Sequence, residues 1–384
     1  MKSSALLRLT FVLLVSVAMS IVVRPPVRAQ DTEPIVAGQK VTLHSRIMNE
    51  DRRLWIFNPD SASSVQTPVI YLLDGDSYFL QTTGIVQFLS NNGKMPAMIV
   101  VGILNTNRTR DLTPLPPDTS LPGSGGADKL LQCLTDEIIP YIDSHYRTAP
   151  YRILVGHSFG GIFAVNAFLR RPEAFNSYIV ISPSLWWGSD TLVKETRTFL
   201  RSHPKVQSSI YATIGDEGPR MVTPSLQLKD VFEANRLEGL TYKFKLMDEE
   251  DHGTIVLKTI YDGLEVLFDG WRVRGDLAAL GMPGLEHHYR QLSEKYGYDV
   301  PIPESTVNNL GYQYLAMNRV DDAVEVLRWN VHHYPKSWNV YDSLGEALAK
   351  KGATEEAIEN YERSISINPG NSNGLTMLKK LKGG

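Results

Sequence analysis

The chain has 384 residues, a length that predicts two to three domains. Hydrophobic residues make up 42% of it and charged residues 21%, which is ordinary for a globular protein and excludes a disordered or fibrous chain. The formal net charge is −3, and removal of residues 1–29, which carry four Lys or Arg and no acid, would lower it to about −7. Because nucleic-acid binding needs clustered basic residues, this acidic balance argues against a nucleic-acid partner.

The first 29 residues have the pattern of a secretory signal peptide. Lys2 and Arg8 precede an apolar run over residues 9–23, and a small residue offers a cleavage point before Gln30. An uncleaved membrane anchor is the alternative, but the run is shorter than the roughly 20 residues that span a bilayer. We therefore expect an exported protein, periplasmic or secreted, without stable membrane insertion after cleavage.

The next part of the chain alternates short apolar segments with helical ones. Residues 40–47 and 52–57 alternate apolar and polar side chains around a turn, which predicts an antiparallel hairpin. The apolar runs that follow are uninterrupted and cover 69–73, 97–102, 152–155, 177–181, 210–214 and 242–247. Helical patterns cover 128–145, 159–171 and 225–237. Strands buried on both faces that alternate with helices predict a three-layer α/β sandwich with a mostly parallel sheet.

The single cysteine, Cys133, excludes an intramolecular disulfide. It falls among Leu130, Leu131, Leu134 and Ile138, at helical spacing. We therefore expect a buried core thiol rather than a nucleophile.

The C-terminal part of the chain repeats with a period of 34 residues. The repeated positions are Leu310-Gly311 with Leu344-Gly345, Ala323 with Ala357, and Pro335 with Pro369. This period, with these residue types at these offsets, is typical of the tetratricopeptide repeat, which offers a surface for a protein partner. Two repeats are fewer than the three or so that are stable alone, so we expect them to dock on the first domain or on residues 275–303.

These patterns divide the chain into four parts. They are the signal peptide over 1–29, an α/β domain over 36–272, a helical connector over 273–303 and two repeats over 304–372. Within the second part, the Pro- and Gly-rich residues 111–126 predict an ordered surface loop or partial lid.

The motif Gly156-His157-Ser158-Phe159-Gly160 is the strongest chemical signal in the sequence. An apolar strand precedes it and a helix follows, which is the context of a nucleophile elbow with the pattern G-x-S-x-G. Such a turn exposes Ser158 at the positive end of a helix, where a developing oxyanion is favoured. The alternative is a glycine-rich turn that Ser158 merely caps.

Ser158 needs a base and an acid that orients the base. His252 directly follows the last predicted strand, where a histidine can take the serine proton. The other histidines lie in helical or surface contexts, and the side chain of His157 is expected to point away. The acid should lie between the two in sequence. Glu217 and Asp216 both follow a strand, and we favour Glu217 while Asp216 stays open.

The oxyanion hole needs two backbone donors. Phe159 supplies one N–H directly after the nucleophile, and Asp76, in the loop after the first buried strand, is placed to supply the other.

Two pairs of side chains on the same rim are candidates for substrate binding. Trp186 and Trp187 follow a strand, and we expect one to form an aromatic wall and the other to pack in the core. Arg108 and Arg110 could hold an anionic substrate. A structural ion pair with Asp111 is the alternative for these arginines.

Five segments, taken in order, resemble the putative-esterase family, which includes esterase D, enterochelin and bacillibactin esterases, feruloyl esterases and antigen 85 acyltransferases. They are YLLDGDSYF (71–79), GHSFGG (156–161), SPSLWWG (182–188), TIGDEG (213–218) and DEEDHG (248–253). The likeness covers residues 36–272 and is closest to the enterochelin-esterase-like branch. It implies the α/β-hydrolase fold, no metal or cofactor, catalytic roles for Ser158 and His252, and the Asp76 N–H in the oxyanion hole. The acid varies within this family, and the repeats are not part of its pattern.

The residues and the resemblance together predict a serine carboxylic-ester hydrolase that works through an acyl-enzyme, with siderophore-type esters as the implied substrates. Three alternatives stay open. The triad could transfer the acyl group to another alcohol, as antigen 85 relatives do, or cleave peptides. Alternatively, the repeats could bind a partner while the hydrolase domain is inert.

Overall fold

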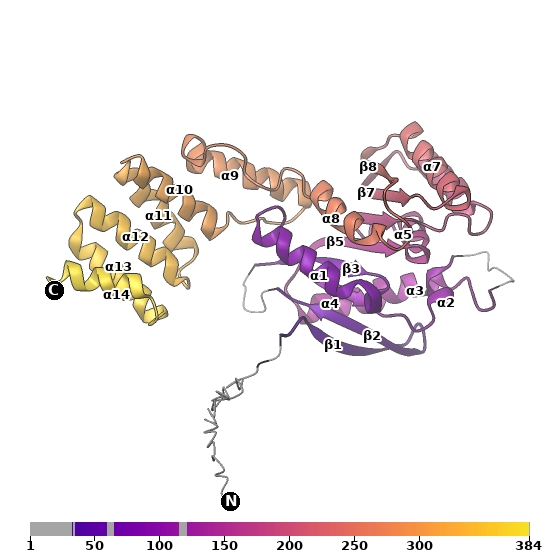
Figure 1. Cartoon of the computed structure of the whole chain (residues 1–384), viewed down its shortest axis with the longest axis horizontal. Helices are drawn as coiled ribbons and strands as arrows, with labels where there is room; N and C mark the ends of the chain where they lie inside the picture. Colours follow the sequence, from indigo (N-terminus) through magenta and orange to yellow (C-terminus); the bar gives the residue numbers. More distant parts are fainter. Residues whose placement is uncertain (1–32, 34, 60–64, 115–120, 384) are drawn as a thin grey trace, which may run out of the picture. The chain divides into compact units, whose positions relative to one another are not determined.

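In a computed structural model of the chain, the described residues are 33, 35–59, 65–114 and 121–383 (Figure 1). The predicted signal peptide, residues 1–29, lies outside them, and so does part of the Pro- and Gly-rich segment. From Ala37 onward the described residues form one contact unit, which holds a sheet domain, a connector and the repeat helices.

Among the described residues, eight strands form a single sheet. They are β1 Gln39–Ser45, β2 Glu50–Phe57, β3 Thr67–Leu72, β4 Ile99–Ile103, β5 Thr148–His157, β6 Ser177–Ile181, β7 Lys205–Gly215 and β8 Glu238–Met247. Their spatial order is β1-β2-β4-β3-β5-β6-β7-β8. The β1–β2 and β2–β4 pairs are antiparallel, and every later pair is parallel. The predicted α/β class with a mostly parallel sheet is confirmed.

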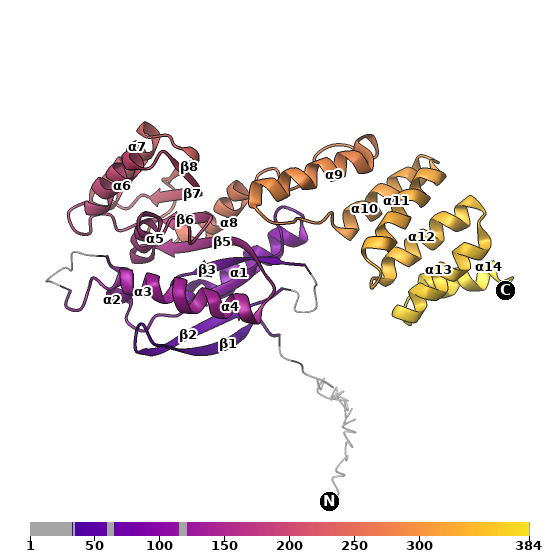
Figure 2. The same ribbon diagram turned by 180° about the vertical axis from the view of Figure 1, so that it is seen from behind.

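Helices cover both faces of this sheet (Figure 2). One face is covered by α1 Gly75–Asn91 and α8 Ile255–Leu267. The other face is covered by α3 Ala127–Cys133, α4 Ile139–His145, α5 Phe159–Arg170, α6 Thr191–Ser202 and α7 Pro219–Ala234. A π-helical turn joins α3 to α4, and a short helix, α2 Arg108–Leu112, follows β4. Along β3, Ile70 and Leu72 enter the first core while Val69 and Tyr71 enter the second. This is why the inner strands read as uninterrupted apolar runs.

The last strand, β8, departs from the predicted burial on both faces. It lies at the sheet edge, where Tyr242 and Phe244 are half-buried against the second core while Lys243 and Lys245 between them are exposed. An edge strand has one neighbouring strand and is only partly covered. Its side chains therefore alternate between half-buried and exposed positions.

An aromatic cluster fixes the connector helix α9, Leu277–Tyr296, to the sheet domain. The ring of Tyr296 lies with its centroid 5.2 Å from that of Tyr151, 5.3 Å from Phe268 and 5.5 Å from Trp271. Its hydroxyl donates a hydrogen bond of 3.1 Å to the carbonyl oxygen of Leu267. Rings packed at these distances add to the stability that buried area provides, so α9 is a fixed part of the domain surface.

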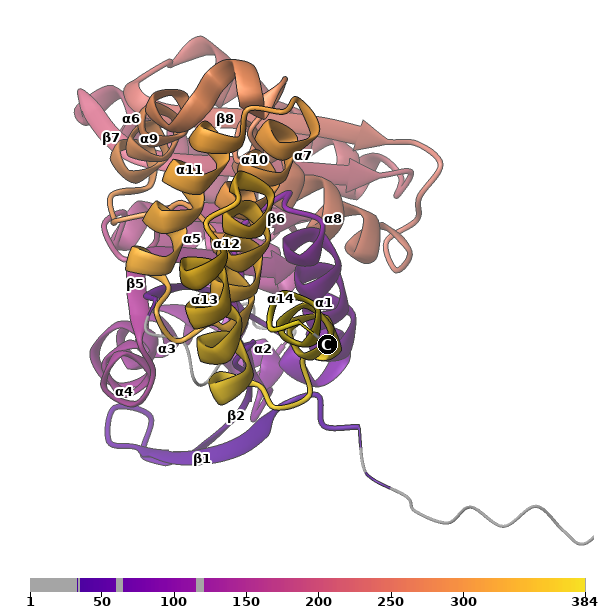
Figure 3. The same ribbon diagram turned by 90° about the vertical axis from the view of Figure 1, so that its left-hand side faces the viewer.

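The repeats form the predicted helix pairs (Figure 3). The helices are α10 Glu304–Ala316, α11 Val320–His333, α12 Trp338–Lys351 and α13 Thr354–Ile367. The repeated glycine is explained by close packing, because a Cβ at Gly311 would lie 2.7 Å from the Cγ of Leu327. The first repeat docks on α9, where the Gln313 side chain accepts a hydrogen bond of 2.9 Å from the N–H of Ala278.

A further helix, α14 Ser372–Leu381, was not anticipated from the sequence. It covers the end of the last repeat, and its cap residue Asn371 donates a hydrogen bond of 2.6 Å to the buried carboxylate of Asp342. Among the described helices, none is both long enough and apolar enough to cross a bilayer.

Candidate active site

Ser158 stands at a sharp turn between β5 and α5. Its backbone has φ 60° and ψ −112°, a strained conformation for a residue with a side chain. The turn is possible because glycines let the two elements approach: a Cβ at Gly156 would lie 2.1 Å from the carbonyl oxygen of Gly160. The Ser158 N–H donates to the Ile181 carbonyl at 3.0 Å, and its Oγ lies 3.1 Å from the Oγ of Ser184. The backbone thus holds the hydroxyl at the end of the helix.

His252 and Glu217 form a close pair on loops that follow neighbouring strands. Glu217 lies after β7 and His252 after β8, and the Oε2 of Glu217 is 2.5 Å from the Nδ1 of His252. The Glu217 side chain is 3% exposed, whereas the His252 side chain is 43% exposed. A buried acceptor on Nδ1 fixes the ring orientation and leaves Nε2 as the ring nitrogen free to act as a base.

The Glu217 carboxylate is held in its ionised form by its neighbours. Burial raises its pKa, but hydrogen bonds from His252, from the Ser182 hydroxyl at 2.5 Å and from the Gly215 N–H at 3.1 Å outweigh this effect. The pKa of Glu217 is therefore below its usual value. A negative charge beside Nδ1 is available to stabilise a protonated His252 at neutral pH.

The two other acids near His252 do not share this position. Asp216 is exposed, and its backbone N–H donates to the Glu250 carbonyl at 2.9 Å. The Asp251 carboxylate accepts hydrogen bonds of 2.8 Å from the N–H groups of Gly253 and Thr254, so it is occupied in its own loop. The geometry joins Glu217 alone of these acids to His252.

The loops that carry Ser158 and His252 meet at one rim of the sheet. The rings of His157 and His252 have centroids 4.5 Å apart, and His157 directly precedes Ser158. The loops after β5, β7 and β8 all leave the carboxyl ends of parallel strands, which lie on the same edge of the sheet. Three residues that are far apart in sequence are in this way brought to one surface.

The predicted oxyanion donors occupy the first turns of two helices. Phe159 is the first residue of α5 and Asp76 the second of α1. Backbone N–H groups in a first helical turn have no acceptor within the helix, so they are free to bind an anion. Asp74, which precedes α1, has a left-handed backbone with φ 52° that turns the chain into the helix.

The two tryptophans separate as the sequence suggested, with one in the core. Trp187 is 2% exposed, and its Nε1 donates to the Pro114 carbonyl at 2.9 Å. Trp186 is half-buried on the rim, where the guanidinium of Arg220 lies 3.9 Å from its ring centroid and the Sδ of Met221 lies 3.2 Å from its Nε1. Met221 also lines a hollow of about 420 Å³ with Glu217 and His252, which places Trp186 beside the pair.

Both candidate arginines are paired with protein carboxylates. Arg110 contacts Glu50 at 2.5 Å and Asp111 at 2.6 Å, which is the structural alternative that the sequence left open. Arg108 makes two hydrogen bonds to Asp74. Their charges are therefore balanced within the protein, and the structure gives Arg110 a structural place rather than one facing a substrate.

Sequence reasoning missed three residues of this rim. Ser182, which holds Glu217, directly follows β6 just as Ser158 follows β5, and this position at a strand end was the available signal. Tyr78, whose hydroxyl lies 3.1 Å from the Nδ1 of His157, and Arg220, which stacks on Trp186, have no signal in the sequence pattern, because each depends on contacts between distant segments.

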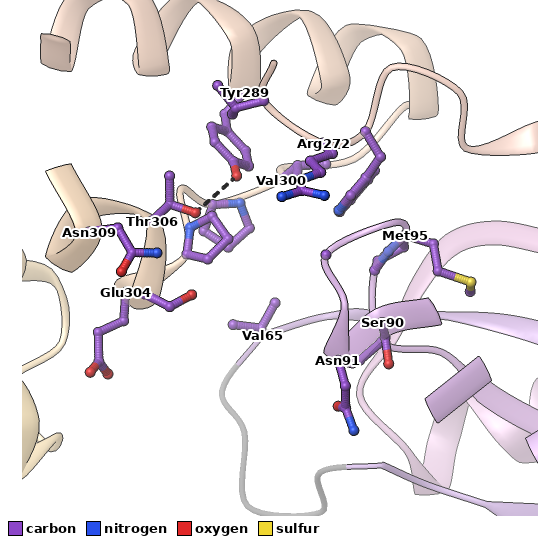
Figure 4. Close-up of a pocket in the computed structure, with 18 of the residues that line it drawn as sticks. Val65, Ser90, Asn91, Met95, Arg272, Tyr289, Val300, Glu304, Thr306 and Asn309 are labelled. Carbon is purple, nitrogen blue, oxygen red and sulfur yellow. Dashed lines mark hydrogen bonds between the residues drawn. The ribbon is translucent and has the colours of Figure 1, made fainter. Parts of the chain in front are cut away.

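A cavity of about 720 Å³ lies elsewhere, between the sheet domain, the connector and α10 (Figure 4). Its lining includes Trp271, Tyr289, Thr306 and Asn309, and the Tyr289 and Thr306 hydroxyls lie 3.5 Å apart. None of the predicted catalytic or oxyanion residues lines it. Chemistry therefore has to be sought at the rim around Ser158 rather than in this cavity.

The buried ring of His157 is expected to make the protein sensitive to acid. Burial, and then the charge of His252, lower the pKa of His157 to about 4. An unfolded histidine titrates near 6.5, so between about pH 6.5 and 4 the unfolded chain binds a proton that the folded chain does not. The free energy of unfolding should therefore fall as the pH falls through this window, by about 3 kcal/mol in total.

Urea unfolding of the wild type and of His157→Gln at pH 7 and pH 4.5 would measure this effect. The variant lacks the titrating ring, so its stability should fall less between the two pH values. Carboxylates such as Glu217 contribute equally to both proteins and cancel in the difference. Parallel losses of stability in the two proteins would show that the burial of His157 has no such consequence.

The sequence comparisons identify an esterase domain and a tetratricopeptide repeat. The family model described as putative esterase matches residues 45–252, more than half of the chain, and a tetratricopeptide-repeat model matches residues 339–371. The siderophore triacetylfusarinine C esterase of Aspergillus fumigatus is 26% identical over 243 residues, which are 53% of this chain and 82% of that protein. The ferri-bacillibactin esterase BesA of Bacillus subtilis is 31% identical over 189 residues, 43% of this chain and 65% of that protein.

A solved structure resembles more of the chain than the esterase model covers. An IroE-like serine hydrolase from Shewanella oneidensis has a TM-score of 0.68 and 27% sequence identity, over 77% of this chain and 99% of that chain. The predicted family is confirmed, and so is a tetratricopeptide repeat over residues 339–371. The chain belongs to the putative-esterase family and is a carboxylic ester hydrolase.

Proposed function

We propose that this enzyme hydrolyses siderophore-type esters through an acyl-enzyme formed on Ser158. The observation that carries the proposal is the contact of 2.5 Å between the buried carboxylate of Glu217 and the ring of His252, at the rim where the Ser158 turn ends. A serine becomes a nucleophile only when a base removes its proton, and the base is effective when an acid orients it.

The reaction follows from these positions in two steps. The Oγ of Ser158 bonds to the ester carbonyl carbon while the Nε2 of His252 takes its proton. The oxyanion that forms accepts hydrogen bonds from the N–H groups of Phe159 and Asp76. The ester C–O bond then breaks, and His252 gives its proton to the departing alcohol. A water molecule deprotonated by His252 then bonds to the acyl carbon, the bond from that carbon to the Ser158 Oγ breaks, and His252 returns the proton to Oγ as the acid leaves.

The support for siderophore-type substrates comes from the relatives and from the openness of the rim. One curated relative is named a siderophore triacetylfusarinine C esterase and the other a ferri-bacillibactin esterase. The His252 ring is nearly half exposed and the hollow beside it is shallow, so the alcohol side of a large ester would remain outside the protein. The half-buried ring of Trp186, with the Arg220 guanidinium stacked on it at 3.9 Å, offers this part of a substrate an aromatic and positively charged contact.

The charge of the rim leads to an expected order among substrates. The hollow beside His252 is lined by Asp216 and Asp251 as well as by Glu217, whereas Arg108 and Arg110 are paired with carboxylates of the protein. Arg220, stacked on Trp186, adds one positive charge to this rim, but the three carboxylates outnumber it, so the surface would repel a polyanionic ester. Among metal-loaded siderophore esters, we expect an uncharged iron(III) trihydroxamate to have a kcat/KM about tenfold above that of a trianionic iron(III) tris-catecholate.

The test is a panel of purified esters with chromatographic analysis of the products. It should contain the two iron complexes, their metal-free forms, a feruloyl ester and a short-chain aryl ester, with the tris-catecholate measured at low and high salt. Salt should raise the turnover of the trianionic ester and leave that of the uncharged ester unchanged. Turnover of the aryl ester without turnover of any siderophore ester would refute the substrate class. A new ester, formed when alcohols are added, would favour acyl transfer instead.

A further inference from the structure

A buried carboxylate lies between the loops that carry the two oxyanion donors. Asp74 is the residue before α1, two positions ahead of Asp76, and its side chain is only 4% exposed. Because a buried charge is costly unless it is paired, the groups that surround Asp74 must hold it closely. They come from the loop after β4, a third segment of the same rim.

Arg108 is the main partner of Asp74. Its Nε donates to Oδ1 at 2.7 Å and its Nη2 donates to Oδ2 at 2.9 Å, so the guanidinium and the carboxylate lie edge to edge. This paired geometry restricts both distance and orientation, which a single ammonium group cannot do. The contact fixes the start of α1, and with it the N–H of Asp76, relative to the β4 loop.

The same guanidinium also reaches the nucleophile loop. Its Nη2 lies 3.3 Å from the carbonyl oxygen of His157, the residue before Ser158, and its Cζ is 5.4 Å from the ring centroid of Phe159. One side chain therefore contacts both loops that supply the oxyanion hole.

Asn105 strengthens the connection from the same β4 loop. Its Nδ2 donates to the Oδ1 of Asp74 at 2.7 Å and lies 3.2 Å from the Oδ1 of Asp76. The Asp76 side chain and the Asp74 carboxylate are thus held by one amide. Asp74, Arg108 and Asn105 together form a unit that we call the oxyanion clamp.

We infer that Arg108 is a positioning residue that sets the spacing between the Asp76 and Phe159 N–H donors, and that it does not act by binding the substrate. The inference rests on the proposed function, because it requires an oxyanion at this place. The donors must lie about 2.7–3.1 Å from the oxyanion, and a misplacement of about 1 Å can cost on the order of 100-fold in rate. The clamp therefore acts on the transition state more than on the bound substrate.

The test compares Arg108→Lys and Arg108→Gln with the wild type on an uncharged p-nitrophenyl ester. We expect kcat to fall by about 10- to 100-fold in both variants, with KM within about twofold of the wild type. Lysine keeps the charge but cannot bridge both oxygens of Asp74 and the His157 carbonyl, so it should not restore the rate. Affinity for a trifluoromethyl ketone, which forms an oxyanion on Ser158, should fall by the same factor as kcat/KM.

The control is Arg152→Ala, which removes another partly buried arginine that pairs with a carboxylate, Asp143 at 2.7 Å. Arg152 is the fifth of the ten residues of β5, six positions before Ser158 and outside the loops of the rim, so its loss should affect thermal stability but not kcat. If Arg108→Lys does not fold, kcat and KM are compared between the wild type and Arg108→Gln, which keeps an amide near Asp74.

Two results would overturn the inference. One is an unchanged kcat in a folded Arg108 variant. The other is a rise in KM confined to anionic esters, which would make Arg108 a substrate-binding residue. Failure of the proposed function would appear differently, because the wild type itself would then neither hydrolyse the ester nor bind the ketone.

Discussion

Replacing Ser158 by alanine is expected to lower kcat for p-nitrophenyl acetate by about 10⁶-fold. Without the hydroxyl there is no nucleophile, and the oxyanion donors alone sustain only a rate about 10³- to 10⁴-fold above that of water. Among the described residues, the Ser158 hydroxyl makes its hydrogen bond to the Ser184 hydroxyl, so the melting temperature should change by about 2 °C or less. Stopped-flow and steady-state assays, with circular dichroism of the same samples, measure both quantities.

A fluorophosphonate probe gives a second readout that does not depend on the choice of ester. The wild type should be labelled at Ser158 and the alanine variant should not. Ser184→Ala is the matched control, because it removes the other hydroxyl of this contact, and it should still be labelled at Ser158. Labelling that persists in Ser158→Ala would place the nucleophile at another residue.

The second large effect is expected at Glu217, where replacement by glutamine should lower kcat by about 10⁴-fold. An amide has nearly the shape of the carboxylate but no charge. It can therefore stabilise the wrong tautomer of His252 and cannot stabilise its protonated form. The amide oxygen can still accept hydrogen bonds from the Ser182 hydroxyl and the Gly215 N–H, which turns the NH2 group toward the Nδ1 of His252.

Asp216→Asn is the control for this prediction, because it makes the same chemical change one residue earlier on an exposed side chain. Its kcat should stay within about threefold of the wild type, since the Asp216 carboxylate does not contact His252. The comparison uses the highest kcat that each variant reaches across the pH range, so that a shifted pH profile does not mimic a loss of rate. A pattern in which Asp216→Asn is the inactive variant would assign the acid to Asp216.

The strained backbone turn at Ser158 is held in place by the elements on both sides of it. The positive φ of Ser158 is held by the β5 ladder on one side and α5 on the other, and by the absence of a side chain at Gly156. A Gly156→Ala change would clash with the backbone of α5 itself, which cannot move without displacing the nucleophile. Strain at such a site persists because the surrounding structure over-determines it.

Several features could be predicted because each is encoded in a short stretch of sequence. The inner strands appear as uninterrupted apolar runs, the elbow appears as glycines around Ser158, and the repeats appear as a period of 34 residues. Each pattern follows from local geometry, such as the spacing of side chains on a strand or the conformations that only glycine tolerates. From these patterns alone came the α/β class, which the structure confirms, and the predictions of Ser158 as the nucleophile and of a division into four parts.

Other features were decided only by the tertiary structure. Glu217 rather than Asp216 contacts His252, Trp187 rather than Trp186 is buried, and Arg110 pairs with Glu50. The exposed edge position of β8 and the capping role of α14 belong to the same group. For the acids, the tryptophans and the arginines, neighbouring residues of similar type compete for a partner in a distant segment. For β8 and α14, the position depends on which distant element packs against them. The sequence offers the candidates, but the choice between them is made by long-range packing, which no local pattern records.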